Sequence, residues 1–236
     1  MATKKNENKD AVLSVELPGI ELGVFSVRIV GDSPLIVHKW SHKAKEEMLG
    51  KQMKKATKGK EAKVPVKDFV DSLYWLDENG NLIDTEHEIP EELEGITNDT
   101  PYEEVYEVIK TGRFGFPACA FKASAIDAGY QQGVIAKKTT ARGAFHILGE
   151  YAVIEGIPDM REDMVQIGGI SKVADIRYRP EFKTWSTTLT IRYNKMSITP
   201  EQIMNLLNYG GFANGVGEWR PSRDGSFGTY HVEGTV

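Results

Sequence analysis

The residues best suited to contact an anion lie between Gly210 and Gly228, where six of nineteen residues are glycine. Glycine admits positive φ and lets the backbone come close to a ligand, so successive N–H groups can converge on phosphate oxygens. Arginine adds a planar guanidinium that matches the same oxygens. We therefore expect this segment to contact phosphate through Gly215, Gly217, Gly225, Trp219, Arg220 and Arg223.

The same segment does not match the loops that bind nucleotides. It lacks the Gly-Lys-Ser/Thr ending of a P-loop and the spacing of a dinucleotide fingerprint. It also follows the C-terminus of an expected helix, where the helix dipole does not favour an anion. We therefore expect no cofactor. The alternative interpretation of the glycines is a structural turn in which Trp219 is buried.

Further basic residues are spread along the chain and can follow the phosphates of an extended strand. The expected nucleic-acid contacts among them are Lys137, Lys138, Arg142, Arg177, Arg179, Arg192, Lys54, Lys55 and Lys58. Nearby aromatic residues are Tyr178, Phe182, Trp185, Tyr193 and, beside the lysines, Trp40. A basic groove with aromatic platforms holds single strands, and each stacked base contributes about 1 to 3 kcal/mol. Core packing is the alternative for each ring except that of Trp40.

Charge is segregated along the chain, although the formal net charge is only −5. Residues 39–67 contain ten lysines and three glutamates, whereas residues 68–108 contain fourteen acidic residues and neither Lys nor Arg. Blocks of like charge are typical of solvated surface or of surfaces that bind partners. We interpret the basic block as a finger that contacts phosphate or the acidic block of a neighbouring copy. A homo-oligomer is therefore expected.

The hydrophobic pattern predicts the elements that position these residues. Strands are expected at 23–30, 35–37, 144–154, 173–179, 185–193 and 227–232, with 173–179 and 185–193 paired as a hairpin. Helices are expected at 117–130 and from a capping box at Thr199 to Gly210, with a basic loop at 137–142. The order strand, helix, strands, helix, strand is that of the βαββαβ plan. The predicted fold class is α+β, an RRM- or ferredoxin-like antiparallel sheet with a long thumb-like insertion after its first strand.

Composition and turn residues divide the chain into three regions. Residues 1–11 are polar and are expected to be disordered. Residues 12–38 and 113–236 form the RRM-like core, and residues 39–112 form an insertion that carries the basic finger and an acidic thumb. In the insertion, a capping box at Thr100 predicts a short helix that ends by Gly112. The single cysteine, Cys119, lies in an apolar run and is expected to be buried.

Two stretches carry a resemblance to a known family. The sequence GVGEWRPSRDGSFGTYHV, residues 215–232, resembles the C-terminal glycine-rich loop and last strand of the RAMP superfamily. The sequence FSVRIVGDSPLIVH, residues 25–38, is similar to its first strand and Ser-Pro-Leu turn. The insertion resembles the thumb of CRISPR backbone subunits. The resemblance, which spans most of residues 22–233, implies a modified RRM fold that binds RNA. A phage protein that binds or anneals single-stranded DNA is an equal alternative.

Catalysis is the main alternative to simple binding, because the superfamily includes metal-independent endonucleases that process RNA with a histidine. His38 directly follows the first strand and can serve as general base for a 2′-hydroxyl, with Arg220 stabilising the phosphorane. His42 lies four residues later, but Lys39 replaces the glutamate of a zincin motif, so we expect no metal. We also expect no catalytic residue. A protein-interaction module that uses the acidic block is a third alternative.

The expected function is binding of single-stranded DNA or RNA by a non-enzymatic protein that oligomerises along the strand. The N-terminus has no hydrophobic signal core, and no run approaches the roughly 18 to 20 apolar residues that span a bilayer. We therefore expect no membrane partner and a location in the cytoplasm of a bacterial or phage-infected cell.

Overall fold

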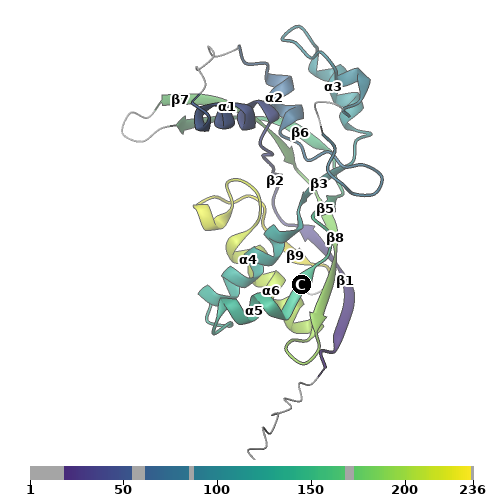
Figure 1. Ribbon diagram of the computed structural model, residues 1–236, viewed down its shortest axis with the longest axis vertical. Helices are drawn as coiled ribbons and strands as arrows, with labels where there is room; N and C mark the ends of the chain where they lie inside the picture. The colour runs from purple at the N-terminus through teal and green to yellow at the C-terminus, as the bar shows by residue number, and fades with distance from the viewer. Residues whose placement is uncertain (1–18, 55–61, 85–87, 168–172, 235–236) are drawn as a thin grey trace, which may run out of the picture.

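The core contains an antiparallel sheet of four strands (Figure 1). The computed structural model describes residues 19–54, 62–84, 88–167 and 173–234. The central strand β1 (Leu22–Gly31) pairs with β8 (Ser186–Asn194) on one side and with β9 (Tyr230–Val232) on the other. A further strand, β4 (Phe145–Ile147), pairs with the other edge of β8. The order across the sheet is therefore β4-β8-β1-β9.

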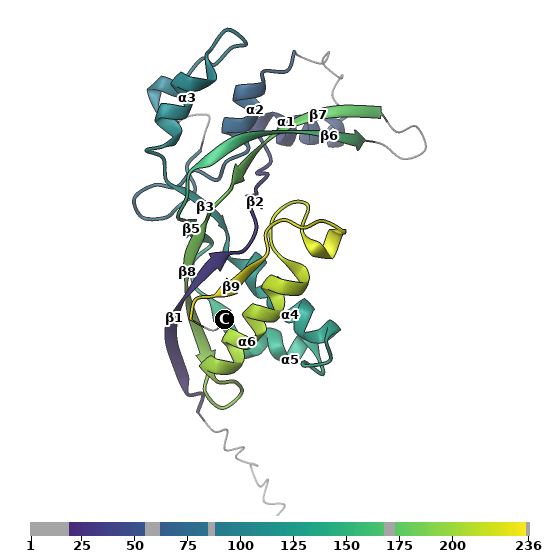
Figure 2. The same cartoon turned by 180° about the vertical axis from the view of Figure 1, so that it is seen from behind.

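Two helices cover one face of this sheet (Figures 1 and 2). The helix α4 (Ala118–Gln131) precedes β4, and α6 (Pro200–Tyr209) connects β8 to β9; the two helices pack against each other. The core elements thus follow the order β1-α4-β4-β8-α6-β9, with the first and third strands adjacent at the centre. This is the βαββαβ plan, and the predicted α+β fold with an antiparallel sheet is confirmed.

Residue spacing explains the layer between the sheet and the helices. In β1, Val27 and Ile29 are buried, whereas Arg28 between them is exposed, because successive side chains of a strand point to opposite faces. In α4, Phe121 and Ala125 are both fully buried, and residues four apart share one helix face. The alternation and the helical period predicted from the sequence therefore place these side chains in one core.

The helix α6 begins at the predicted capping box. The Thr199 side chain accepts a hydrogen bond from the Gln202 N–H at 3.3 Å, and the Thr199 N–H donates to the Gln202 side chain at 3.0 Å. The predicted end at Gly210 is not a stop, because the chain continues into a π-helical turn, η2 (Gly210–Asn214). A Cβ atom at Gly211 would collide with the backbone of Tyr230, so glycine permits this turn to lie against β9.

A long antiparallel hairpin extends from the core sheet (Figure 1). It consists of β6 (Pro158–Ile167) and β7 (Val173–Phe182), and β2 (Leu35–Ile36) pairs with the C-terminal end of β7. The predicted hairpin between 173–179 and 185–193 is wrong, since β7 pairs with β6 and β2, whereas β8 pairs with β1 and β4.

Side-chain chemistry explains why β7 and β8 do not pair. Leu189 of β8 is buried opposite Val27 of β1, in the apolar layer beneath the helices. Arg179 of β7 is only 6% exposed, and its guanidinium lies 3.3 Å from the carboxylate of Asp163 in β6. A buried charge without a partner is strongly destabilising. Pairing with β6 supplies the partner that Arg179 requires.

The insertion packs against the hairpin, at the top of Figure 1. Its elements are α1 (His42–Gln52), α2 (Pro65–Asp71), the 3-10 turn η1 (Glu91–Leu93) and α3 (Tyr102–Ile109). Phe69 of α2 and Ile109 of α3 belong to the same hydrophobic core as Phe121 and Leu189. The short sheet of β3 (Phe114–Pro117) and β5 (Tyr151–Ile154) lies between the two regions. We call the β6–β7 hairpin together with α1 and α2 the arm.

The basic loop predicted at 137–142 is wrong, because a helix, α5 (Lys138–Ala144), occupies most of it. Its Ala141 and Ala144 are buried three residues apart, which anchors one helix face. The expected burial of Cys119 is also wrong, since its side chain is exposed in the first turn of α4. Among the described helices, none is long and apolar enough to cross a membrane.

The capping box predicted at Thr100 does not form. The helix α3 begins after Pro101, whose side chain cannot cap, and the Thr100 hydroxyl accepts a hydrogen bond from the Thr97 N–H at 3.0 Å. The predicted short helix is present and ends at Ile109, before Gly112.

Candidate nucleic-acid interface

The glycine-rich loop, residues 215–228, folds tightly upon itself. A Cβ atom at Gly225 would collide with the backbone of Trp219, and one at Gly228 would collide with the backbone of Val216. Gly217 has φ of 80°, in the left-handed region that favours glycine. These glycines therefore serve the packing of the loop. This agrees with the structural interpretation of the segment.

The N–H groups expected to bind phosphate are largely used within the protein. The Gly215 N–H donates to the Gly210 carbonyl at 2.9 Å, and the Gly225 N–H donates to the Arg220 carbonyl at 3.2 Å. The Phe227 N–H donates to the Trp219 carbonyl at 3.1 Å. The expected phosphate contact by the Gly215 and Gly225 amides is therefore wrong, because each already has a backbone acceptor.

The two arginines of the loop differ in how they are held. The Arg220 guanidinium donates to the Gly217 carbonyl at 2.7 Å and to the Ser222 hydroxyl at 2.9 Å, so its position is fixed across the loop. Arg223 is exposed and ends a 3-10 turn, η3 (Pro221–Arg223). Within the described residues, no carboxylate forms an ion pair with either arginine. Both charges are available to an anion.

The loop is attached to the segment that follows β2. The Glu218 N–H donates to the Ile36 carbonyl at 2.9 Å, and the Glu218 carboxylate lies 3.9 Å from Nδ1 of His38. Burial lowers the pKa of His38, and the positive charge of Arg179 lowers it further, against the opposing effect of Glu218. His38 is therefore neutral at pH 7.

A pocket of ≈ 290 Å³ opens between α4 and this loop. Its polar lining includes His38, Tyr74, Asp127, Gln131, Glu218 and Arg220. Two carboxylates and one guanidinium give the lining a mixed charge. The pocket can accept a polar group but is not built for a polyanion alone.

Two exposed indoles lie close in sequence to Glu218 and His38. Trp219 adjoins Glu218 and is 43% exposed, and Trp40 lies two residues after His38 and is 55% exposed. Trp219 has φ of 52°, which is unusual for a bulky side chain and costs on the order of 1 to 3 kcal/mol. The loop thus holds Trp219 outside the core at a cost in strain, and the alternative in which this ring is buried in a turn does not hold. Trp40 is exposed, as expected.

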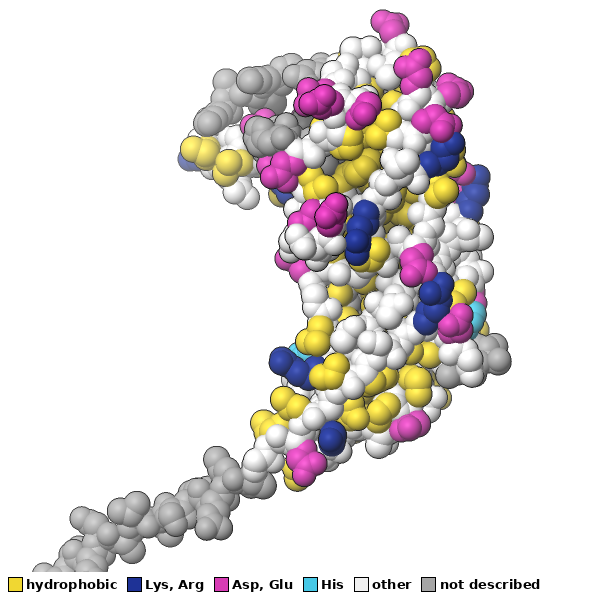
Figure 3. Space-filling model, turned by 90° about the vertical axis from the view of Figure 1, so that its right-hand side faces the viewer, with side chains coloured by type: hydrophobic (Ala, Val, Ile, Leu, Met, Phe, Trp, Pro, Cys, Tyr) yellow, Lys and Arg dark blue, Asp and Glu magenta, His cyan; other side chains and the backbone are white. Residues whose placement is uncertain are grey.

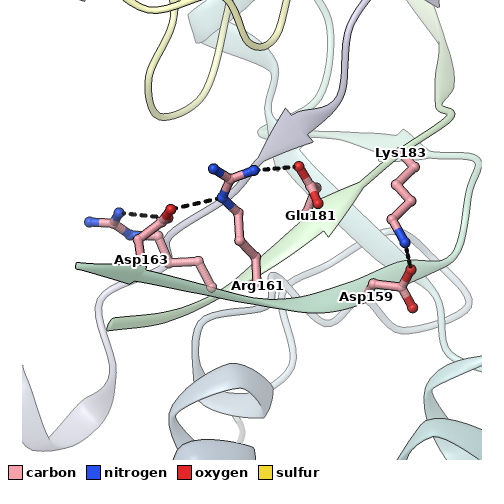
Figure 4. A network of polar contacts seen from close by, with 6 residues as sticks. Asp159, Arg161, Asp163, Glu181 and Lys183 are labelled. Atoms are coloured by element: carbon pink, nitrogen blue, oxygen red, sulfur yellow. Dashed lines mark hydrogen bonds and ion pairs between the residues drawn. The ribbon is translucent and has the colours of Figure 1, made fainter. Parts of the chain in front are cut away.

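The face of the arm that contacts the glycine-rich loop carries a network of charges (Figure 4). Arg161 bonds to Asp163 and Glu181, each at 2.8 Å, and Arg179 bonds to the second oxygen of Asp163. The ring of Phe227 in the glycine-rich loop lies 4.6 Å from the Arg161 guanidinium, so the loop contacts this face of the arm. Arg179 is buried and paired, and the expectation that it binds nucleic acid is wrong.

Most other predicted basic contacts are dispersed over the molecule. Arg177 lies 3.6 Å from Asp175 in β7, and Lys138 forms an ion pair with Asp127 at 2.8 Å. Lys54 is exposed just after α1. Lys55 and Lys58 lie outside the described residues. The predicted groove is therefore not a continuous stripe of free charges.

Two of the remaining basic residues, Arg142 and Arg192, belong to one group at another place. Lys137, Arg142 and Arg192 are exposed, and Arg192 of β8 lies opposite His146 of β4. Lys122 of α4 contacts the same group. Lys122 and His146 were not singled out from the sequence, because only the fold brings them beside Arg142 and Arg192.

The sheet face that the helices leave uncovered offers no aromatic platform. It faces right in Figure 1 and toward the viewer in Figure 3, where uncharged side chains dominate its lower half and acidic ones gather above. Along its centre, Ser26 of β1 lies opposite Thr190 of β8, and Val24 lies opposite Arg192. Recognition modules of the RRM type stack bases on aromatic residues of this face. That mode of binding has no Phe, Tyr or Trp ring along this face, where the rings are the imidazoles of His146 and His231 at the two edges.

The aromatic residues expected to stack bases belong to the interior or its margin. Phe182 and Trp185 are buried in the core, which is the alternative given for these rings. Tyr193 packs edge-on against Phe25 at 5.6 Å, and Tyr178 is half-buried against the core. Phe212, which is 84% exposed in η2, was missed because its flanking glycines and alanine indicated only a turn.

The protein thus has an α+β fold built on an antiparallel βαββαβ core. No family model matches the chain, and no curated protein matches it. It is similar to a solved structure, the crystal structure of Cmr6 from Pyrococcus furiosus, with 11% sequence identity and a TM-score of 0.30. The match covers 91% of this chain and 100% of that chain. The fold class follows from the strand order and helix positions described above.

Proposed function

We propose that the protein binds single-stranded nucleic acid, without cleaving it, at the surface where the glycine-rich loop meets the segment after β2. The observation that carries the proposal is the pair of exposed indoles, Trp40 and Trp219, on two segments held together by the bond from Glu218 to Ile36. Exposed rings that flank fixed polar groups are the platforms on which single-strand binders stack bases. Bases in a duplex are already stacked, which favours single strands.

Charge supports the same surface. Arg220 is fixed by two hydrogen bonds, and Arg223 is exposed three residues further along the loop. A guanidinium held in place loses little freedom when it binds phosphate. We infer that Arg220 and Arg223 contact the phosphates of the strand whose bases stack on Trp219. The resemblance of this loop to the RAMP superfamily supports the same assignment.

Assembly along the strand is part of the proposal. Exposed acidic side chains cover η1, α3 and the loop between them, namely Glu91, Glu92, Glu94, Asp99, Glu103, Glu104 and Glu107. Among the lysines of residues 39–67, Lys45 and Lys54 are exposed in the part of the chain that the structure describes. Opposite charges on two surfaces of one chain favour head-to-tail contact between copies. We infer that neighbouring copies meet through these two surfaces.

Strand cleavage is a second candidate, and one observation favours it. His38 lines the pocket beside Arg220 and is neutral, so it can accept a proton from a 2′-hydroxyl. The glycine-rich loop would then hold the reacting phosphate. This candidate requires RNA, because DNA lacks the 2′-hydroxyl.

One experiment tests both candidates. Labelled single-stranded RNA, single-stranded DNA and duplex DNA are titrated with the protein, and the strands are then examined on a denaturing gel. Binding to both single strands without shortening supports the proposed function. Preference for the duplex overturns it. Shortening of RNA alone that is lost in His38→Ala establishes the endonuclease instead.

A further inference from the structure

Four basic side chains meet around β4, at the edge of the core sheet opposite β9. The members of this β4 cluster are Lys122 of α4, Arg142 of α5, His146 of β4 and Arg192 of β8. Lys122 Nζ donates to the Arg142 carbonyl at 2.7 Å and lies 3.4 Å from His146 Nδ1. His146 and Arg192 are direct partners in the β4–β8 register, so their side chains leave the same face of the sheet.

No carboxylate compensates these charges within the described part of the chain. Burial lowers the pKa of Lys122, and the charge of Arg142 lowers it further. Partial loss of solvent around the imidazole likewise lowers the pKa of His146, followed by the charges of Lys122 and Arg192. The fold thus holds like charges together against their repulsion, although an acidic neighbour would relieve it.

Other basic groups of the molecule show what the β4 cluster lacks. Lys138, which is near it on α5, pairs with Asp127 at 2.8 Å. His231 pairs with Asp32 at 2.6 Å at the opposite edge of the sheet. Each has a carboxylate in contact. The β4 cluster therefore carries an excess of positive charge and is not part of a network of surface ion pairs.

The β4 cluster offers hydrogen-bond donors to an oxyanion. Lysine can only donate, so in its contact with Lys122 the Nδ1 atom of His146 accepts, and the imidazole proton lies on Nε2. The His146 side chain is exposed, so this proton can be offered to a ligand. The guanidinium groups of Arg142 and Arg192 add further donors. A tetrahedral oxyanion can accept from several of these donors together.

We propose that Lys122, Arg142, His146 and Arg192 form a binding site for a phosphoryl group. The group can belong to a phosphodiester of a nucleic-acid strand or to a free phosphate or nucleotide. The site does not rest on the proposed function, because it shares no residue with the surface around Trp40 and Trp219. A bound anion would offset the mutual repulsion of Lys122, Arg142 and Arg192 and would favour protonation of His146.

The test measures the pKa of each histidine by proton NMR, in inorganic phosphate and in chloride at equal ionic strength. Phosphate is expected to raise the pKa of His146 by about 1 unit, the usual effect of an opposite charge in contact. His231 is the internal control, since Asp32 already occupies its Nδ1. An unchanged His146, or an equal rise at His231, would overturn the proposal.

Variants of the full chain distinguish phosphate bound at the β4 cluster from a nonspecific effect of phosphate on the charges of the protein. Lys122→Gln and Arg192→Gln are each expected to abolish most of the phosphate-dependent rise at His146, whereas Lys110→Gln on the far side of the molecule retains it. Arg192 is exposed, so its variant keeps the test valid if Lys122→Gln does not fold. If both folded variants respond as the unchanged protein does, the assignment is wrong.

Three probes then identify the source of the phosphoryl group. They are inorganic phosphate, a short oligonucleotide with a 5′-phosphate and the same oligonucleotide without it. A response to all three identifies a backbone phosphodiester as a ligand, and a response to the first two alone identifies a phosphate monoester. Absence of a response to every probe refutes the site. Strand binding that depends on Trp219 is measured in a separate experiment. The phosphoryl site and the proposed strand binding can therefore each be refuted without the other.

Discussion

The Glu218 N–H donates to the Ile36 carbonyl at 2.9 Å and thereby joins the glycine-rich loop to β2. Ile36 also pairs with Glu181 of β7, so the same strand is attached to the arm on one side and to the loop on the other. A loop of fourteen residues is thus positioned by backbone contacts rather than by side chains alone. The position of Trp219 follows from these contacts.

We expect Gly228→Ala to destabilise the protein through the loop. Gly228 has φ of 66°, and a Cβ there would collide with the Val216 backbone, so the substitution should lower the free energy of unfolding by more than about 1 kcal/mol. Gly143→Ala in α5 is the matched control, because nothing lies within 4 Å of its added Cβ. That variant should be neutral or slightly stabilised. Urea unfolding of both proteins checks the difference, and equal stability would contradict the account of the loop.

We expect Trp219→Gly to reduce affinity without reducing stability. Glycine accepts the observed φ of 52° without strain, while loss of the indole removes the stacking platform. Affinity for single strands should fall by about 1 to 3 kcal/mol. The measurement is fluorescence anisotropy together with thermal unfolding. Phe212→Ala removes another exposed ring outside the proposed surface, and an equal loss of affinity in both variants would argue against a specific role for Trp219.

We expect Arg223→Gln to reduce the salt dependence of strand binding. Each phosphate contact with a single strand contributes about 0.7 to the slope of log K against log salt concentration. Removal of one exposed guanidinium should therefore reduce the slope by roughly that amount. Titrations over a range of salt concentrations measure it, with Lys110→Gln as a variant of equal charge change. A slope that both substitutions leave unchanged would show that Arg223 does not touch the strand.

We expect Asp163→Asn to destabilise the arm strongly. Asp163 accepts bonds from Arg161 and from Arg179, and the latter would keep a buried charge without a counterion. Removing one partner of a buried pair costs about 3 to 5 kcal/mol. Asp159→Asn is the control, because its partner Lys183 is 66% exposed and an exposed pair contributes at most about 1 kcal/mol. Denaturant unfolding compares them, and similar losses in both would contradict the buried network.

We expect stability to decline as pH falls below 6.5, with His38 as one cause. The folded state lowers the pKa of His38 through burial and Arg179, so between the folded and unfolded values the unfolded chain binds more protons. The contribution is therefore complete above pH 6.5 and is lost as pH falls through the folded value. Unfolding measured from pH 7.5 to 5 should show a shallower decline in His38→Gln. An identical profile would remove His38 from the explanation.

Periodicity predicted the parts of the fold that have one buried face. The alternation of Val27 and Ile29 identified β1, and the capping box at Thr199 identified the start of α6. The strand β6 escaped notice because Arg161 and Asp163 on one face alternate with Glu162 and Met164 on the other, and neither face is apolar. Its stability comes from ion pairs with β7, which spacing along one strand does not reveal.

The candidate site was predictable in composition but not in geometry. Sequence alone does not distinguish a glycine whose N–H meets a ligand from one such as Gly225, whose N–H meets its own loop. Nor does it show that Lys122 and His146 meet, because they lie on different elements that only the sheet and its helices bring together. The exposure of Trp40 was correctly inferred from its lysine neighbours. A ring beside lysines has few apolar side chains to pack against.

The pairing of Ile29 with Val232 also has a consequence for synthesis on the ribosome. The central strand is translated early, yet its two neighbours, β8 and β9, emerge only after most of the described chain has been made. Until then both edges of β1 remain unpaired, and unpaired edges recruit other strands. The nascent chain should therefore depend on chaperones that shield the segment around Val27 until β8 reaches it.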